Sequence, residues 1–194
     1  PLDIFKKKRL DLLIECIGMS DGVSKKVVET ALKNKIHVVT PNKALIAKHG
    51  DYLSKLAEKN KVNLEFEASV GGGIPIIRTI KEGLATNKIN KVFGILNGTC
   101  NYILSTMETT GRGFEEVLAD AQRFGYAEAE PSFDIDGIDA AHKLTILAAI
   151  AFGHKPDFNA VSIQGIRDVS SVDFAYANQL GFRIKLVGVA EPGL

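Results

Sequence analysis

The sequence has little cysteine, almost no net charge and no long apolar run. Its 194 residues include two cysteines, Cys16 and Cys100, which lie far apart and outside any CxxC pattern. We therefore expect reduced thiols, buried as small apolar groups, in a cytoplasmic protein. A net charge of +1, from 24 basic and 23 acidic residues, argues against a nucleic-acid partner. The longest nearly apolar run, residues 144–152, is far shorter than the roughly 20 residues of a membrane span, so we expect no membrane partner.

The first third of the chain alternates strand and helix patterns. Residues 10–17 (LDLLIECI) form a nearly continuous apolar run, which predicts a strand buried on both faces of a parallel sheet. Ser24 is the expected N-cap of the helix pattern that follows. The other patterns predict strands at 36–40 and 63–69 and helices at 24–34 and 42–60, the second interrupted near Gly50. Strand, helix, strand, helix, strand is the order of an open parallel α/β sheet.

The pattern changes after the glycine run 71–73. The segments that follow predict helices at 74–84, 99–110, 113–124, 139–152 and 171–180, and strands at 90–96 and 183–190. We therefore expect an α/β protein in which residues 1–67 are a remnant of a nucleotide-binding domain with a parallel sheet. Residues 68–194 are expected to form an α+β domain.

The glycine run itself leaves two interpretations open. Gly71, Gly72 and Gly73 lie between a predicted strand and a predicted helix, where bare backbone N–H groups can contact an anion. The run is not a P-loop, because no Lys-Ser/Thr pair follows, and Ile76 occupies the third glycine position of a GxGxxG pattern. A tight turn and a phosphate-facing loop both fit.

Five carboxylates crowd into twelve residues that contain no basic side chain. They are Glu128, Glu130, Asp134, Asp136 and Asp139. Such a cluster could hold a cation, hold a substrate ammonium group or form a solvated acidic loop. An EF-hand is excluded, because Asp139 occupies the loop position that requires glycine.

Two lysines stand out by their positions. Lys143 follows Asp139 by four residues on an otherwise apolar helix, so both side chains share one face. It is either a snorkelling residue at the helix edge or a partly buried amine with a function. Lys43 follows Pro41 and Asn42 at a strand-to-helix turn, the end of a parallel sheet where ligands bind, although an exposed first-turn lysine would look the same. The histidines show no zinc-ligand spacing.

The run from Ala121 to Lys143, AQRFGYAEAEPSFDIDGIDAAHK, closely resembles the signature of homoserine dehydrogenases. The family more often has Asp where Glu130 stands, which keeps the charge. Three more segments agree with the family in the same order: residues 39–43 (VTPNK), 67–75 (EASVGGGIP) and 97–104 (NGTCNYIL).

This resemblance implies NAD(P)-dependent interconversion of L-aspartate 4-semialdehyde and L-homoserine. Lys143 and Lys43 would flank the reacting oxygen, and one of them would donate or accept its proton while hydride moves to or from the nicotinamide. Such amines can also stabilise a developing alkoxide. The residues implied to hold the amino acid substrate are Glu128, Asp134, Asp139, Gly98, Thr99 and Tyr126.

The resemblance also implies a cofactor, a metal ion and a partner. The residues implied to contact NAD or NADP are Ile17, Gly18, Thr40, Pro41, Asn42, Lys43 and Gly71. A sodium or similar ion would be held by the Glu67 side chain and by the main-chain carbonyls of Val70, Gly72 and Ile74, because hard cations prefer oxygen. A Rossmann-like remnant would precede a catalytic, substrate-binding and dimerisation domain, whose mixed sheet would pair with a second copy into a homodimer.

Two features of the family pattern do not occur in this sequence. They are the N-terminal GxGxxG unit and a glycine-rich segment near the C-terminus, both of which serve cofactor binding. We expect either a part of a longer chain, with or without internal omissions, or a stable fragment that lacks full nucleotide affinity. Two alternative functions stay open: a non-catalytic dimerisation and substrate-binding core, and another amino acid semialdehyde dehydrogenase of the same two-domain plan.

Overall fold

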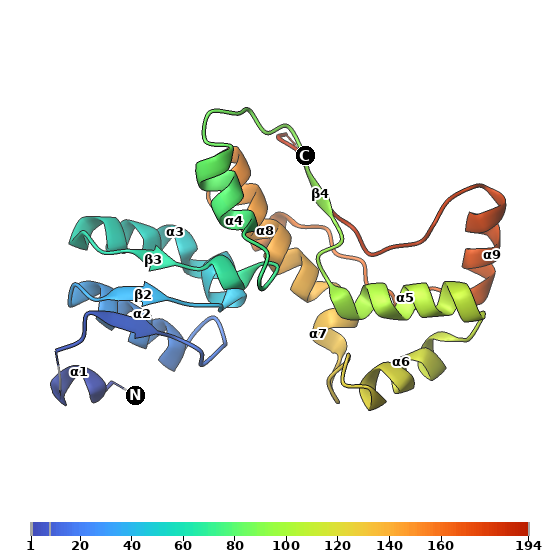
Figure 1. The fold of residues 1–194 in the computed structure, drawn as a ribbon, viewed down its shortest axis with the longest axis horizontal. Coiled ribbons are helices and arrows are strands. Elements are labelled where there is room, and N and C mark those ends of the chain that lie inside the picture. The colour runs from blue at the N-terminus through green and yellow to red at the C-terminus, as the bar shows by residue number, and fades with distance from the viewer. Residues whose placement is uncertain (1, 8, 194) are drawn as a thin grey trace. The chain divides into compact units, whose positions relative to one another are not determined.

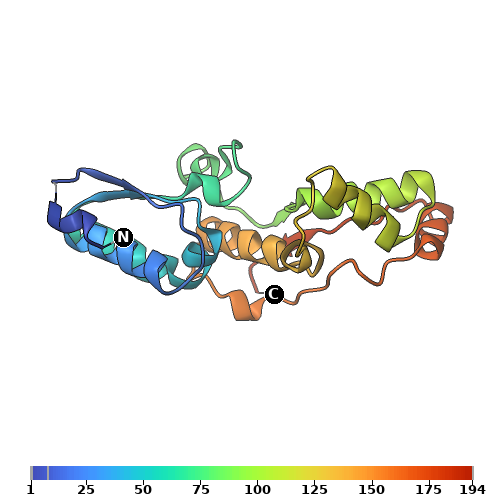
Figure 2. The ribbon, with the colours of Figure 1, turned by 90° about the horizontal axis from the view of Figure 1, so that it is seen from below.

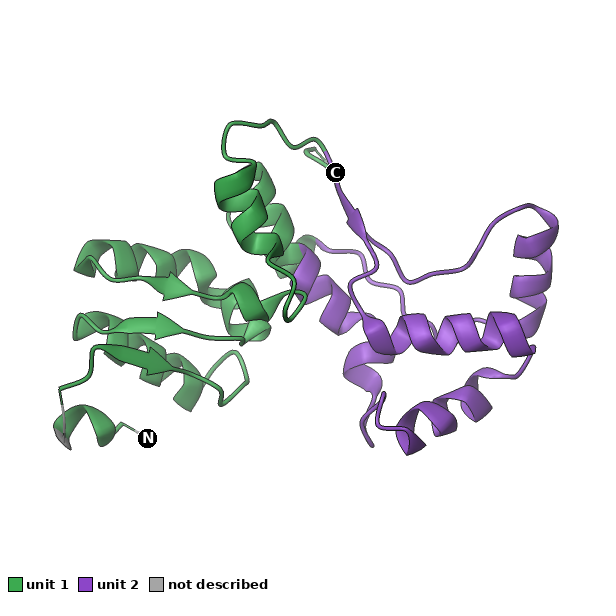
Figure 3. Cartoon of the chain, viewed as in Figure 1, with its two compact units in different colours: residues 1–90, 145–160, 191–194 green, residues 91–144, 161–190 purple. Residues whose placement is uncertain are grey.

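The computed structural model describes residues 2–7 and 9–193 of the chain, which forms two compact units. The first comprises residues 1–90, 145–160 and 191–194, and the second comprises residues 91–144 and 161–190 (Figure 3). Among the described residues, the structure contains no helix that could cross a membrane.

Helices and strands alternate at the start of the first unit. Its elements are α1 (Ile4–Lys7), β1 (Leu12–Ile14), α2 (Val23–Lys33), β2 (His37–Val39), α3 (Lys43–Asn60), β3 (Leu64–Glu65), the 3-10 turn η1 (Glu67–Ser69), α4 (Ile76–Arg78), the π-helical turn η2 (Thr79–Gly83) and the 3-10 turn η3 (Phe158–Ala160). The elements of the second unit are β4 (Val92–Gly94), α5 (Gly98–Thr110), α6 (Phe114–Arg123), α7 (Ser132–Ile135), α9 (Ser171–Gln179) and β5 (Gly188–Ala190). Helix α8 (Ile138–Phe152) has residues in both units.

The sheet of the first unit confirms the predicted open parallel α/β arrangement. The strand order is β1-β2-β3, with Leu13 opposite Val38 and Val38 opposite Leu64. Helices α2 and α3 pack together on one face of this sheet (Figure 2). The strand order runs in one direction, so two crossovers of the same hand place both helices on the same face.

Three expectations for the first strand region were wrong. Leu12 and Ile14 are 51% and 66% exposed, so the strand is not buried on both faces. The reason is that α2 and α3 cover one face of the sheet, where Leu13 lies beside the buried Val38, whereas Leu12 and Ile14 alternate onto the other face. Cys16, which follows this strand, is exposed rather than buried, whereas Cys100 is buried as expected. The N-cap of α2 is Gly22 and not Ser24. The Ser24 hydroxyl is buried and donates to the Glu15 carboxylate.

Further boundaries differ from the patterns for identifiable reasons. Helix α3 runs without a break through Gly50, whose missing side chain leaves room for Ile46 and Pro156. The predicted strand at 63–69 stops at Glu65, and the predicted helix at 74–84 is divided into α4 and η2. Of the strand predicted at 183–190, only the last three residues form a strand, β5. The short helices α1 and α7 were not predicted, because they have too few residues to show a helical periodicity.

A buried carboxylate organises the loops of the first unit. Glu15 is 1% exposed, and its Oε1 accepts hydrogen bonds from the Ser24 hydroxyl at 2.8 Å and from the backbone N–H groups of Ile17 and Gly18. Its Oε2 accepts from the Thr40 hydroxyl at 2.6 Å. Burial alone would raise the pKa of Glu15, but these hydrogen bonds outweigh it and hold the pKa below its usual value of 4.5.

The core of the second unit lies between α5 and α6 (Figure 1). Ile103, Leu104 and Met107 of α5 are fully buried, and Val117 and Ala121 of α6 pack in the same apolar cluster. Strands β4 and β5 form an antiparallel pair with Phe93 opposite Val189. The acidic segment, residues 128–139, follows α6, so the packing of α6 against α5 determines the position at which this segment begins.

Gly165 fixes the position of the short helix α7 in this unit. The N–H of Ile166 donates to the carbonyl of Ile135 at 2.8 Å. A Cβ atom on Gly165 would lie 2.5 Å from that carbonyl oxygen and 2.8 Å from the Cα of Asp136. Because both neighbours are backbone atoms, only glycine permits this contact.

The substitution Gly165→Ala should therefore destabilise the second unit by about 1–3 kcal/mol, the usual cost of overpacking. Gly94→Ala, in β4 of the same unit, is the matched control, since the nearest atom to a Cβ there is Leu96 Cδ2 at 3.9 Å, an ordinary contact. Chemical denaturation of both variants measures the difference. Equal stability of the two variants would contradict the packing described here.

The substitution Glu15→Gln should lower the free energy of unfolding by about 1–3 kcal/mol at pH 7, because four donors lose a charged acceptor. The folded pKa lies below 4.5, so the ionised group stabilises the fold above about pH 4.5 and this contribution is lost as the pH falls through the folded value. Urea denaturation from pH 7 to pH 3 should show the difference from the wild type shrinking below about pH 4.5. Glu58→Gln, on an exposed carboxylate, is the control; a pH-independent difference for Glu15→Gln would refute this account.

Candidate functional site

Helix α8 brings Lys143 and Asp139 together, as the four-residue spacing predicts. Lys143 Nζ donates to Asp139 Oδ2 at 2.6 Å and to the Leu96 carbonyl at 2.9 Å. The lysine side chain is 19% exposed and that of Asp139 is 5% exposed. Lys143 is therefore a partly buried amine with defined partners rather than a snorkelling residue. The structure gives its third N–H no partner among residues 2–7 and 9–193.

Asn97 connects this ion pair to a second carboxylate. Its Nδ2 donates to Asp139 Oδ2 at 2.9 Å and to Asp134 Oδ1 at 2.7 Å. Its Oδ1 accepts from the N–H of Cys100 at 2.7 Å, which caps the N-terminus of α5. Two of the predicted substrate residues, Asp134 and Asp139, thus lie around one buried amide.

Cys100 lies beside these carboxylates and is chemically inert. Burial, with the nearby charges of Asp134, Asp139 and Asp136, raises the pKa of its thiol to about 12. Its Sγ donates to the Asp134 carbonyl at 3.2 Å. The group therefore stays a neutral thiol at neutral pH and serves packing rather than nucleophilic chemistry.

The other acidic residues have different surroundings. Asp136 pairs with Arg167, which lies 31 positions further along the chain, and the Arg167 guanidinium holds the pKa of Asp136 below its usual range. Hydrogen bonds from the hydroxyl and N–H of Ser132 likewise lower the pKa of Glu130. Glu128 is exposed. The acidic segment 128–139 contains no basic residue, so its basic partners, Lys143 and Arg167, come from outside the segment.

The remaining predicted substrate residues lie in the same unit. Gly98 is the first residue of α5, and the Thr99 hydroxyl donates to the Tyr126 carbonyl at 2.8 Å. The ring of Tyr126 lies 4.6 Å from that of Tyr102. Thr99 therefore ties the start of α5 to the segment that leads into the acidic residues.

The predicted cofactor residues all belong to the first unit, where they follow the carboxyl ends of its parallel strands. Those after β1 and β2 are Ile17, Gly18, Thr40, Pro41, Asn42 and Lys43, and Gly71 comes after β3. Glu15 joins the first two loops through its four hydrogen bonds, and Asn42 Nδ2 adds bonds to the Met19 carbonyl and the Ser24 hydroxyl. Since ligands bind at this edge of parallel sheets, the position fits a cofactor. Lys43 is the first residue of α3, and its predicted pairing with Lys143 of the other unit stays a prediction.

The four predicted metal ligands lie in and after η1. The Glu67 carboxylate accepts from the N–H groups of Ile77 at 2.9 Å and Arg78 at 2.8 Å, one on each oxygen. Each oxygen keeps a lone pair beyond these bonds, so the carboxylate still suits a hard cation. Gly72, with φ of 58°, turns the chain between the carbonyls of Val70 and Ile74. The ion itself stays a prediction.

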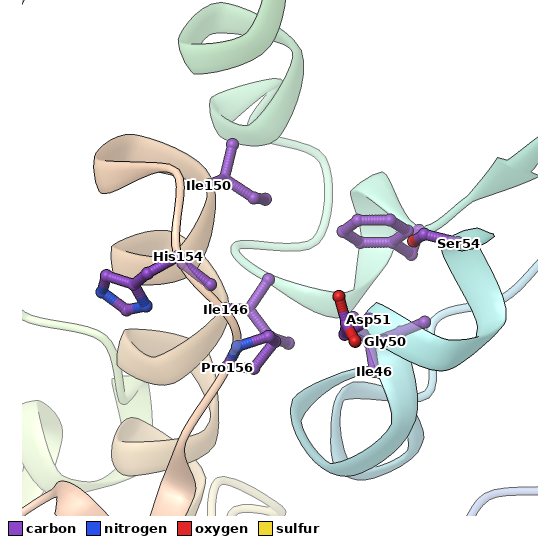
Figure 4. Close-up of a pocket in the computed structure, with 10 residues that line it drawn as sticks. Ile46, Gly50, Asp51, Ser54, Ile146, Ile150, His154 and Pro156 are labelled. Carbon is purple, nitrogen blue, oxygen red and sulfur yellow. The ribbon is translucent and has the colours of Figure 1, made fainter.

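The first unit also contains a cavity of about 210 Å³ that none of the predicted residues line. Figure 4 shows Ile46, Asp51 and Ser54 of α3 facing Ile146 and Ile150 of α8 across it. Its walls are mainly apolar. The predicted chemistry therefore lies elsewhere.

The sequence patterns did not predict the contacts of three side chains that organise the candidate site residues. Asn97 and Glu15 each organise a group of predicted residues, and Arg167 neutralises Asp136. A carboxylate inside the apolar run 10–17 was the available signal for Glu15, since a buried charge needs partners. An asparagine before Gly-Thr at a helix start was the signal for Asn97. No local pattern reports a contact as distant as that of Arg167.

Comparison with known families follows the same division of the chain. The family model described as homoserine dehydrogenase matches residues 75–193, and the one described as homoserine dehydrogenase, NAD binding domain matches residues 2–67. Together they cover nearly all of the sequence.

Known proteins of similar sequence and structure agree with these models. A homoserine dehydrogenase of Neisseria gonorrhoeae is 48% identical over 98% of this chain and 44% of the relative. The crystal structure of a homoserine dehydrogenase from Thiobacillus denitrificans matches with a TM-score of 0.92 and 49% identity, over 95% of this chain and 42% of that one. A hyperthermophilic archaeal homoserine dehydrogenase in complex with NADPH matches with a TM-score of 0.81 and 30% identity, over 94% and 53%.

The chain thus spans less than half the length of the bacterial relative from Neisseria gonorrhoeae. Its motifs, its fold and both family models indicate the same family. It belongs to the homoserine dehydrogenase family.

Proposed function

We propose that the full-length protein containing this chain interconverts L-homoserine and L-aspartate 4-semialdehyde with NAD or NADP. The observation that carries the proposal is the group formed by Lys143, Asp139, Asn97 and Asp134. This group joins the partly buried ammonium of Lys143 to the carboxylate of Asp134, which has no basic partner among residues 2–7 and 9–193. Family membership favours this function over another amino acid semialdehyde dehydrogenase.

The substrate's own charges explain the acidic segment. Homoserine carries an ammonium group, and Asp134 has a second carboxylate oxygen beyond the one that Asn97 holds. Glu128 is exposed and lies earlier in the same segment. Asp134 and Glu128 would bind the substrate ammonium, whereas Asp139 is already committed to Lys143.

Lys143 is suited to move the proton of the reacting oxygen. Asp139 and the Leu96 carbonyl take two of its N–H bonds and fix the direction of the third. In the direction of aldehyde reduction, Lys143 would give this proton to the carbonyl oxygen, and in homoserine oxidation it would take the hydroxyl proton. Lys43 would stabilise the developing alkoxide, as the family resemblance implies.

The loops after β1 and β2 are proposed to hold the cofactor. The nicotinamide group supplies the hydride chemistry when it is bound. Glu15 keeps the loops of Ile17–Gly18 and Thr40–Asn42 in fixed positions, and Gly71 follows β3 at the same sheet edge. A sodium ion on Glu67, Val70, Gly72 and Ile74 would add rigidity to the segment that leads from Gly71 to α4.

The division of labour along the chain is part of the proposal. Residues 1–67 would form a partial dinucleotide-binding domain, and residues 68–194 would form the catalytic, substrate-binding and dimerisation domain. The boundaries of the two family models, at 67 and 75, support this division. The first compact unit extends beyond residue 67 to residue 90, because it includes α4 and η2.

A homodimer would cover an exposed apolar face of the second unit. Phe93 and Val189 lie opposite each other in β4 and β5, and both are exposed, Phe93 by 67%. Ile95 adds a third exposed apolar side chain two residues beyond Phe93. An apolar sheet face of this kind is typical of an interface between protein chains.

Replacing the catalytic lysine tests the activity. Lys143→Ala should lower kcat for homoserine oxidation by about 10²–10⁴-fold, the usual cost of losing an acid/base group, with little change in the dissociation constant of the cofactor. The assay is homoserine-dependent formation of NADH or NADPH by the full-length protein. Lys59→Ala, on an exposed lysine of α3, is the control. A kcat for Lys143→Ala near that of the wild type would overturn the assignment.

The dimer is tested by a charge on its proposed face. Phe93→Lys should raise the dissociation constant of the dimer at least about tenfold, because an apolar side chain is replaced by one that resists burial. Sedimentation velocity of the full-length protein over a range of concentrations measures this. Tyr52→Lys, at an exposed position of the first unit, should leave association unchanged. Identical sedimentation of all three proteins would contradict the proposed interface.

A further inference from the structure

Asn97 has only one orientation that its neighbours allow. Its Oδ1 faces the N–H of Cys100, which can only donate, and its Nδ2 faces carboxylate oxygens of Asp134 and Asp139. Turning the amide over would put an oxygen against two carboxylates and an NH₂ group against an N–H. The buried amide is therefore locked, with both of its N–H bonds directed to acidic side chains.

The two residues that precede α5 hold the Lys143–Asp139 pair from both sides. The Leu96 carbonyl accepts from Lys143 Nζ, and the Asn97 amide donates to Asp139. Asn97 and Lys143 donate to the same oxygen, Oδ2 of Asp139, at 2.9 Å and 2.6 Å. The position of the ammonium thus depends on where Asn97 holds that oxygen.

Asn97 also lies between two like charges. Asp134 and Asp139 share its NH₂ group, and of these two carboxylates only Asp139 contacts an ammonium group among the described residues. A neutral donor shared by two carboxylates offsets part of their repulsion at a buried position. Without this donor, the carboxylates would separate and the ammonium would follow Asp139.

We infer that Asn97 is a positioning residue of the reaction, which sets Lys143 for proton transfer through Asp139 and orients Asp134 toward the substrate ammonium. This inference rests on the proposed function and deepens it. One residue thereby couples the proton-transfer group to the group that binds the amino acid.

The cap that Asn97 provides for α5 must be separated from this role. Serine and aspartate are good N-cap residues, so Asn97→Ser and Asn97→Asp keep an acceptor for the N–H of Cys100. Neither keeps the two N–H bonds that the amide donates: serine has one hydroxyl donor on a shorter side chain, and Asn97→Asp has no donor and adds a third carboxylate. Ser170→Ala is the matched control, because it removes the hydroxyl that pairs with Asp173 in the capping box of α9, in the same unit, and leaves the carboxylates of residues 128–139 untouched.

The kinetic test uses the full-length protein with homoserine and a saturating cofactor. Asn97→Ser should lower kcat by about 10- to 100-fold through the misplaced lysine, and should also raise KM for homoserine through the misplaced Asp134. Asn97→Asp should lose more. Ser170→Ala should retain wild-type kcat and KM at a similar loss of thermal stability. The inference is overturned if Asn97→Ser stays within twofold of the wild type, or if Ser170→Ala loses activity to the same extent.

A second measurement needs no activity. The rate of acetylation of Lys143 by acetic anhydride, followed by peptide mass spectrometry, should rise severalfold in Asn97→Ser because the ammonium is held less firmly, while the rate at exposed Lys59 stays constant. An unchanged rate at Lys143 would overturn the positioning role. A wild-type protein that does not oxidise homoserine would instead overturn the proposed function, whatever the acetylation rate shows.

Discussion

One carboxylate oxygen, Oδ2 of Asp139, connects the parts of the candidate site. It accepts from Lys143 on its own helix and from Asn97 at the start of α5. A buried carboxylate without such partners would cost several kcal/mol, so both donors stabilise the fold. The same contacts leave the lysine with one N–H for a substrate. Stability and the proposed proton transfer would therefore depend on the same hydrogen bonds.

The first unit uses the same physical device at a different place. Glu15 is buried and satisfied by two hydroxyl groups and two backbone N–H groups, which fixes the loops after β1 and β2. The penalty for burying its charge is offset by these hydrogen bonds, as its lowered pKa indicates. Each unit thus has a buried carboxylate that organises the residues proposed to bind one of the two reactants.

The fold was predictable wherever a pattern is local. The helical spacing of α2, α5 and α8 and the order of the parallel strands follow from periodicity and turn residues, and the pairing of Lys143 with Asp139 follows from their four-residue spacing. The burial of each sheet face was not predictable in this way. Whether both faces of β1 are covered depends on where the helices pack, and this information is absent from the run 10–17 itself.

The candidate site residues stand out one by one in the sequence, but the contacts between them do not. The acidic segment and the lysines stand out by composition, whereas Asn97 and Arg167 act across 37 and 31 positions of sequence. Such contacts are created by packing, for example by the close fit of Gly165 beneath α7. Their chemistry can be explained from the residue types once the structure shows that they meet.

The most direct test of the central claim is an experimental structure of the full-length protein with L-homoserine bound. The account predicts the substrate hydroxyl within hydrogen-bond distance of Lys143 Nζ, the substrate ammonium on Asp134, and Asn97 still between Asp134 and Asp139. A substrate hydroxyl directed away from Lys143, or an ammonium group bound away from the acidic segment, would contradict it.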